Sequence, residues 1–130
     1  MILIFLQNAY ASKDIKPWKL KQRKIWEPRL WKSHTGKRLK EMLPDGAVFY
    51  VANANPIIGT RASDCFDADI IHMQLEICNV KPDVILACGK IAQEGLNRLG
   101  QKYIAAPHPA WRLLSKAMTA EIRSKLIAYA

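Results

Sequence analysis

The chain has 130 residues, half of them hydrophobic, and its 20 Lys and Arg against 11 Asp and Glu give a formal net charge of +9. This length supports one modest hydrophobic core, so we expect a single domain spanning residues 1–130. Three cysteines with no C-x-x-C pair disfavour a disulfide framework, a zinc site and an iron–sulfur cluster. The apolar run at residues 2–6 is too short for a signal peptide or a membrane span. We therefore expect a cytoplasmic monomer without a metal, a cofactor or a membrane partner.

The chain alternates short apolar runs with helical stretches. Strands are predicted, in chain order, at residues 2–6, 47–52, 83–88 and 102–106. Helices are predicted at residues 35–43, 67–80, 89–99 and 115–129. Strands that are buried on both faces and connected by helices form parallel sheets. The predicted fold class is therefore α/β, a three-layer α/β/α sandwich around a four-stranded parallel sheet.

Between the first two predicted strands, residues 13–40 form a basic segment that accounts for the whole net charge. It holds eleven Lys or Arg against two acidic residues, with Trp18, Trp26 and Trp31 among the cations. Such a run is often a solvated face, and its indoles can equally anchor it to the core. Aromatic rings beside cations also offer stacking planes worth about 1 to 3 kcal/mol per base, so we favour nucleic-acid binding.

Each predicted strand ends at residues that can carry chemistry or a tight turn. Residues 7–10 follow the first strand, residues 53–56 the second, Gly89 and Lys90 the third, and His108 the fourth. Because functional groups of parallel sheets gather at the carboxyl ends of the strands, these residues predict one pocket. The alternative for each is structural, since Asn is a turn former and Gly permits a sharp turn from strand to helix.

Several motifs, in a fixed order, carry a resemblance to a known family. They are Trp31-x-Ser33-x-x-Gly36-x-x-Leu39, Phe49-Tyr50-Val51-Ala52-Asn53, Pro82-Asp83-Val84-Ile85-Leu86-Ala87-Cys88-Gly89-Lys90-Ile91-Ala92-Gln93 and His108-Pro109-Ala110-Trp111. The ordered set resembles the uracil-DNA glycosylase superfamily. In motif order it is most similar to the thermophilic iron–sulfur family, whose cysteines this chain lacks.

The resemblance implies an enzyme that flips a nucleotide out of DNA and hydrolyses its N-glycosidic bond. Asn53 would read the uracil edge, because a carboxamide presents a donor and an acceptor side by side, and Asn55 is the alternative. Trp31, or else Phe49 or Tyr50, would stack on the base. The remaining base-binding candidates are Gln7 and Tyr10, the latter as a wall against the 5-methyl group of thymine.

Two residues would carry the catalysis. His108, as a neutral imidazole, would donate a hydrogen bond to the departing uracil anion. Asn8 stands where most of the related families have a water-activating acid, although the mismatch-specific branch also has Asn there. An amide can orient a water molecule but cannot take its proton, so we expect a slow, dissociative reaction.

The loop after His108 and the basic residues would bind the DNA. Trp111, Arg112 and Leu113 are placed to enter the duplex and contact phosphate, although Trp111 and Leu114 could instead be core residues at the start of the last helix. The other DNA-binding candidates are Lys90, Arg23, Lys24, Lys32, Lys37 and Arg38.

The sequence leaves three hypotheses of function. The preferred one is a DNA repair enzyme that excises uracil, or a related modified pyrimidine, in base excision. Asn8 favours the second, a catalytically weak or inactive relative that binds DNA as a sensor or regulator. The third is an interaction scaffold whose basic segment binds RNA or an acidic protein.

Overall fold

The computed structural model of the protein describes residues 1–7, 23–57 and 66–129, and for residues 23–27 it describes the backbone alone. Asn8 and Tyr10 therefore lie outside the described residues, as do the first ten residues of the basic segment. None of the helices in the described ranges is both long enough and apolar enough to span a membrane.

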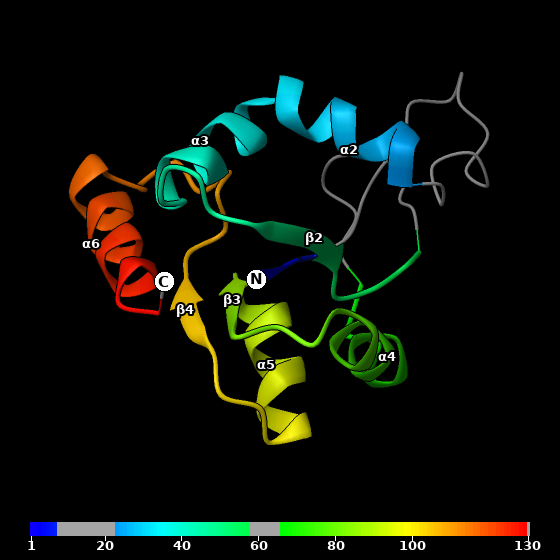
Figure 1. The fold of residues 1–130 in the computed structure, drawn as a ribbon. Helices are drawn as coiled ribbons and strands as arrows, with labels where there is room; N and C mark the ends of the chain where they lie inside the picture. Colours follow the sequence, from blue (N-terminus) through cyan, green and yellow to red (C-terminus); the bar gives the residue numbers. More distant parts are fainter. Residues whose placement is uncertain (8–22, 58–65, 130) are drawn as a thin grey trace.

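Four strands form one sheet in which every pair is parallel (Figure 1). They are β1 (Ile2–Leu6), β2 (Phe49–Asn53), β3 (Val84–Cys88) and β4 (Ile104–Ala106), in the spatial order β2-β1-β3-β4. The five residues of β1 and the five of β3 are all buried, because each of these strands has a neighbour on both sides and helices on both faces. The predicted four-stranded parallel sheet is confirmed.

Five helices accompany the sheet in the described part of the chain. They are α2 (Arg23–Lys32), α3 (His34–Met42), α4 (Ile70–Val80), α5 (Lys90–Leu99) and α6 (Lys116–Ile127). The side chains of Ser33, Asp69 and Ser115 each accept a hydrogen bond from the first turn of the helix that follows, which fixes where α3, α4 and α6 begin. Four of the five helices lie where the sequence predicts them, within a few residues at each end.

The side chains of the sheet alternate between two hydrophobic clusters, one on each face. Ile2, Ile4 and Leu6 of β1 pack with Leu39 of α3 and Leu126 of α6. The alternate residues of the strands pack on the other face with α4 and α5, through residues such as Met73 and Leu96. The molecule is therefore the predicted three-layer sandwich, with α3 and α6 on one face and α4 and α5 on the other.

Helix α2 is the element that the sequence pattern did not predict. Pro28 lies inside it, and proline interrupts the backbone hydrogen bonding of a helix. The helix packs closely on α3 at Gly36, where a Cβ atom would overlap the carbonyl group of Leu30. This close approach explains the glycine in the Trp31–Leu39 motif, since any larger residue would push the two helices apart.

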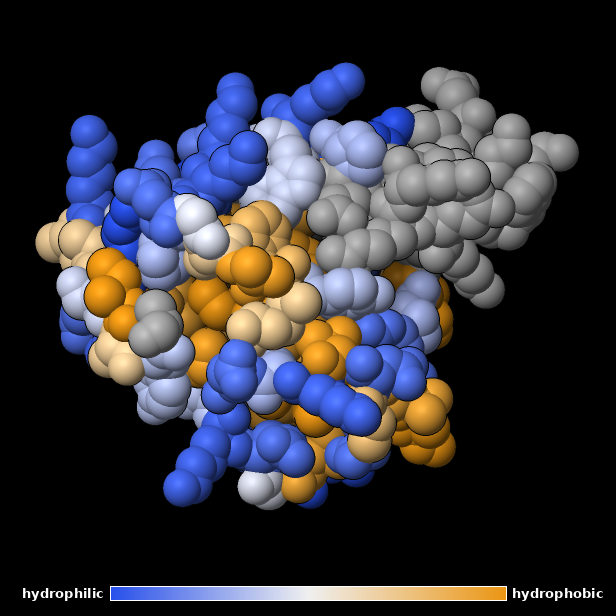
Figure 2. Space-filling view, viewed as in Figure 1, coloured by the Kyte–Doolittle hydropathy of each residue, from blue (hydrophilic) through white to orange (hydrophobic). Residues whose placement is uncertain are grey.

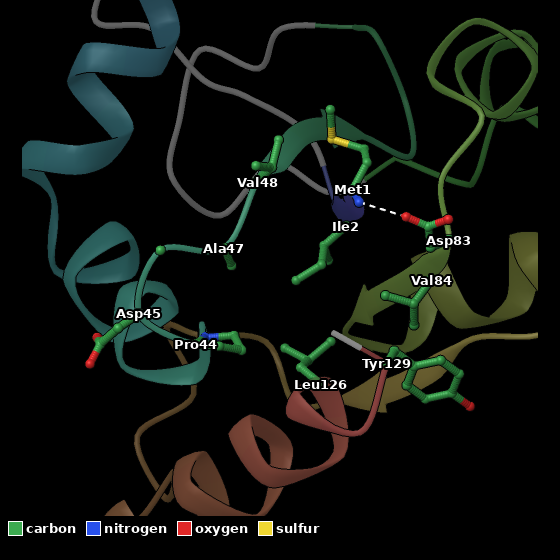
Figure 3. A pocket seen from close by; sticks show the side chains of 11 residues that line it. Met1, Ile2, Pro44, Asp45, Ala47, Val48, Asp83, Val84, Leu126 and Tyr129 are labelled. Atoms are coloured by element: carbon green, nitrogen blue, oxygen red, sulfur yellow. Dashed lines mark hydrogen bonds and ion pairs between the residues drawn. The ribbon is translucent and has the colours of Figure 1, made fainter.

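A hollow lies at the amino ends of β1 and β3, beside the loop before β2 (Figure 3). Its walls come from the N-terminus, the loop before β2, the start of β3 and the end of α6, and its lining includes Ile2, Val84 and Leu126. Met1, Val48 and Tyr129 at the same end are substantially exposed. Figure 2 shows hydrophobic surface gathered at the centre of this face, with hydrophilic surface along the edge formed by α2 and α3.

Candidate active site

The carboxyl ends of the four strands lie along one edge of the sheet, since all strands are parallel. Gln7 follows β1, Asn53 ends β2, Gly89 follows β3 and His108 lies two residues beyond β4. The first two exits are joined by backbone hydrogen bonds from Ala54 N–H to the Leu6 carbonyl, 2.7 Å, and from Asn55 N–H to the Gln7 carbonyl, 3.0 Å. The parallel topology thus collects the described strand-exit residues that the sequence singled out.

His108 is half-buried and its ring is fixed by a hydrogen bond from its own loop. The N–H group of Ala110 lies 3.0 Å from Nδ1 of His108. A backbone N–H can only donate, so Nδ1 accepts and the neutral ring carries its proton on Nε2. Burial lowers the pKa of His108 below its ordinary value. The residue is therefore a neutral imidazole near pH 7, with Nε2–H as its donor.

The turn that follows β3 lies directly beside His108. Gly89 has φ +92°, a conformation that disfavours any side chain, and a Cβ atom there would lie 3.5 Å from the Cβ of His108. The Gly89 N–H donates to the carbonyl of Ala106, 2.8 Å. Nε2 of Gln93, on the first turn of α5, donates to the same carbonyl at 3.0 Å and to that of Ala87 at 3.3 Å. Gln93 thus ties the ends of β3 and β4 together just before His108.

The two asparagines after β2 have different environments. Asn55 is buried, its Nδ2 donates to the Asp67 carbonyl at 2.7 Å and its Oδ1 accepts from the Ile57 N–H at 2.8 Å. Its carboxamide therefore joins the chain just after β2 to the residues just before α4. Asn53 is half-buried, and its side chain makes no hydrogen bond to any residue in the described ranges. Of the two, Asn53 is the one whose carboxamide has no hydrogen-bond partner among the described residues.

Asn53 and His108 stand at opposite sides of the same edge, because β2 and β4 are the outer strands of the sheet. Three strand spacings separate them, roughly 14 Å between backbones. The strand order therefore places the two predicted base-contacting residues at the two ends of the carboxyl edge.

The aromatic candidates for base stacking lie elsewhere. Trp31 packs edge-on against Phe49, with 5.5 Å between ring centroids, and Lys40 Nζ lies 5.4 Å from the centre of its ring. Phe49 is the first residue of β2 and lies four residues, roughly 13 Å, from Asn53. Tyr50 packs on the opposite face of the sheet, with the α4 and α5 cluster. The structure does not bring Trp31 or Phe49 to the carboxyl edge.

The loop after His108 projects a tip of three exposed residues, Trp111, Arg112 and Leu113. Leu113 is 72% exposed and Trp111 41%, while Leu114 directly after them is buried in the core. Two turns shape the tip, with Trp111 N–H donating to the His108 carbonyl at 2.9 Å and Leu114 N–H to the Trp111 carbonyl at 3.2 Å. The alternative of a core position therefore holds for Leu114 but not for Trp111.

The predicted DNA-binding cations divide into three groups. Lys32, Lys37 and Lys90 are exposed, and the side chains of Arg23 and Lys24 are outside the described part. Arg38 is half-buried and is already engaged, because its Nη1 donates to the Trp111 carbonyl at 2.8 Å and its Nη2 donates to the Leu114 carbonyl. Sequence reasoning missed this use of Arg38, and it missed the bridging role of Gln93.

A cluster of the iron–sulfur type does not fit this chain. Such clusters use four cysteine thiolates, whereas the sequence has three cysteines in all. Cys88 is buried at the end of β3, where burial raises its pKa to about 12, and Cys78 is exposed on α4. In the described ranges no group of three His, Cys, Asp or Glu side chains could hold a metal ion.

Comparison with known families gives one match. The family model described as "Uracil DNA glycosylase superfamily" matches residues 14–129, a range that contains Asn53, Gly89 and His108 and begins after Asn8. Searches of curated proteins and of solved structures give no match. The family match covers most of the chain, and the four-stranded parallel sheet agrees with it. On this evidence the chain belongs to the uracil DNA glycosylase superfamily.

Proposed function

We propose that this protein is a DNA glycosylase that removes uracil, or a related modified pyrimidine, from DNA. Membership of the superfamily supports glycosylase-type action on DNA. The single observation that carries the finer proposal is the fixed tautomer of His108, whose Nδ1 accepts from Ala110 so that Nε2–H is a donor. A neutral donor of this kind suits a leaving group that becomes an anion.

In the proposed reaction the C1′–N1 bond breaks and its electron pair leaves with the base. Negative charge then spreads onto O2 of uracil, where the Nε2–H of His108 would stabilise it. Water adds its oxygen to C1′, and its proton passes to the departing base or to bulk water. Asn53 would hold the base by its N3–H and O4 edge, because its carboxamide offers the matching acceptor and donor.

The exposed tip at Trp111–Leu113 would fill the space that the flipped nucleotide leaves in the duplex. Apolar side chains hold a base step open at a cost of a few kcal/mol, which contacts with the flipped base must offset. Lys90, Lys32 and Lys37 are exposed and would contact phosphates. Binding should then weaken steeply as salt is added, because each phosphate contact releases counterions.

The test is incubation with single- and double-stranded oligonucleotides that contain uracil, followed by alkaline cleavage of abasic sites. Scission by the wild type that falls in Asn53→Ala supports the proposal. Asn79→Ala is the matched control, because Asn79 is an exposed asparagine in the last turn of α4. This variant should give as much scission as the wild type. No scission above that of His108→Ala, over a range of salt concentrations, would defeat the proposal.

A second candidate is a DNA-binding relative with little or no turnover, favoured by Asn8 in place of an acid. The substitution Asn8→Asp separates the two. A carboxylate should accelerate a latent glycosylase, since it can accept a proton from water, and should change nothing in a pure binder. Salt-sensitive binding to uracil or abasic DNA without base release, in the wild type and in Asn8→Asp, would select the second candidate.

A further inference from the structure

Arg38 reaches from α3 to the loop that carries His108 and the exposed tip. Its two terminal nitrogens donate to the carbonyl groups of Trp111 and Leu114, residues 73 and 76 positions later in the sequence. These carbonyls lie at the beginning of the tip and just after its end. The guanidinium therefore bridges the two ends of the tip, with one hydrogen bond to each.

The tip has few other means of holding its shape. Its side chains are exposed, and its own backbone hydrogen bonds form two successive turns. Leu114 anchors one end in the core. Among the described residues, Arg38 supplies the side-chain hydrogen bonds that reach the tip from another element. Hydrogen bonds from a charged donor are stronger than the neutral backbone bonds of an ordinary turn.

We propose that Arg38 is a positioning residue that sets how far the Trp111–Leu113 tip reaches into a duplex. This inference rests on the proposed function. It assigns Arg38 a different role from the phosphate contact that the basic segment suggests. The guanidinium is half-buried, and its two terminal nitrogens already donate to two carbonyl groups. Lysine cannot reproduce this role, since a single ammonium group lacks a planar pair of donors.

Two substitutions separate positioning from phosphate binding. Arg38→Lys keeps the charge and loses the planar pair of donors, whereas Arg38→Gln loses the charge and keeps an amide that can donate to one carbonyl. For a positioning residue, Arg38→Lys should lower kcat/KM on double-stranded uracil DNA about tenfold, as expected for the loss of one charge-assisted bond, with Arg38→Gln no worse. On single-stranded DNA, which has no duplex to open, both variants should stay within about twofold of the wild type.

The salt dependence of binding supplies the control. Lys37→Gln, which removes an exposed cation next to Arg38, should reduce the slope of log K against log salt by about 0.9 and affect both DNA forms. Arg38→Lys should leave that slope unchanged. If Arg38→Lys kept the wild-type kcat/KM on double-stranded DNA and Arg38→Gln did not, the proposal would be overturned in favour of a phosphate contact. Equal losses on single- and double-stranded DNA would overturn it in favour of general stabilisation.

A double-mutant cycle with Leu113→Ala adds a test of the mechanism. Leu113 is 72% exposed, so its truncation should not harm the fold. If Arg38 acts through the tip, Arg38→Lys should cost little more once Leu113 is gone. Additive losses would count against the inference.

A readout without turnover keeps this inference separate from the proposed function. The probe is a duplex with 2-aminopurine beside a tetrahydrofuran abasic site, whose fluorescence reports whether the neighbouring stack is opened. The wild type and Lys37→Gln at saturation should change the fluorescence, while Arg38→Lys at saturation should change it less. This result would stand even if the wild type released no uracil. An equal change in Arg38→Lys and wild type would refute the positioning role by itself.

Discussion

The two ends of the same parallel sheet are built in contrasting ways. At the amino end, charged groups are paired within the chain: the N-terminal amine lies 2.7 Å from Asp83 (Figure 3), and Arg123 contacts Asp45 at 3.1 Å. At the carboxyl end, the side chain of Asn53 and Nε2 of His108 make no hydrogen bonds to the described residues. The difference teaches that charged groups at the amino end have partners within the chain, whereas the polar groups at the carboxyl end are the ones that we propose to contact a ligand.

The largest expected effect is a loss of activity from a substitution at the carboxyl end that leaves the fold intact. His108→Ala should lower the rate of base release by about 100- to 1000-fold, the usual cost of one lost donor to a developing anion. The free energy of unfolding should change little, because the ring is half-buried and its one described hydrogen bond is local. Single-turnover kinetics and urea denaturation of the same preparation measure both quantities. A loss of unfolding free energy as large as the rise in activation free energy would contradict the contrast between the two ends.

The converse experiment is made at the amino end. Leu126 is buried in the α6 face and lines the amino-end hollow. Leu126→Ala should cost about 2 to 5 kcal/mol of unfolding free energy, because it removes buried methyl groups and leaves a cavity. Below its melting temperature the folded variant should release base at nearly the wild-type rate. A specific loss of kcat in folded protein would show that the two ends are coupled.

A smaller effect is expected at Gly89, where the backbone itself shapes the site. Gly89→Ala should cost about 1 to 3 kcal/mol in stability, because φ +92° and ψ 168° lie in a region that is essentially restricted to glycine. The added methyl group would lie at ordinary contact distance from His108, so a clash contributes little. Gly100→Ala is the matched control, since Gly100 also has positive φ, at +69°, but lies at the C-terminus of α5, away from His108. Gly100→Ala should lose no more stability than Gly89→Ala, because Gly100 lies in the left-handed helical region, and Gly89→Ala alone should lose activity.

The smallest expected effect is the contribution of His108, a single half-buried group, to the pH dependence of the unfolding free energy. Burial lowers the folded-state pKa of His108, so the unfolded chain binds more protons below about pH 6.5. The stability that His108 contributes is therefore present above that pH and is lost as the pH falls through the folded-state pKa. Urea denaturation at pH 5 and pH 7.5 should show a larger difference for the wild type than for His108→Gln. Equal differences would mean that the ring titrates normally.

Much of the fold follows from local pattern. The apolar runs gave all four strands, because a strand buried on both faces must be apolar throughout, and helical periodicity gave α3 to α6. Helix α2 was not predicted, since its apolar residues follow no clear helical period and Pro28 is a helix breaker. Its stability comes from packing on α3 at Gly36, a contact between elements that no local pattern reports.

The sequence by itself determined which groups collect at the carboxyl edge, because parallel strands must end on the same side wherever their residues lie in the chain. Only the tertiary structure decided what those groups are free to do. Hydrogen bonds occupy the side chain of Asn55 but not, within the described ranges, that of Asn53. A turn fixes the proton of His108 on Nε2, and two carbonyls engage Arg38. A side chain's role depends on which partners lie within about 3 Å of it, and those partners come from residues up to 76 positions away.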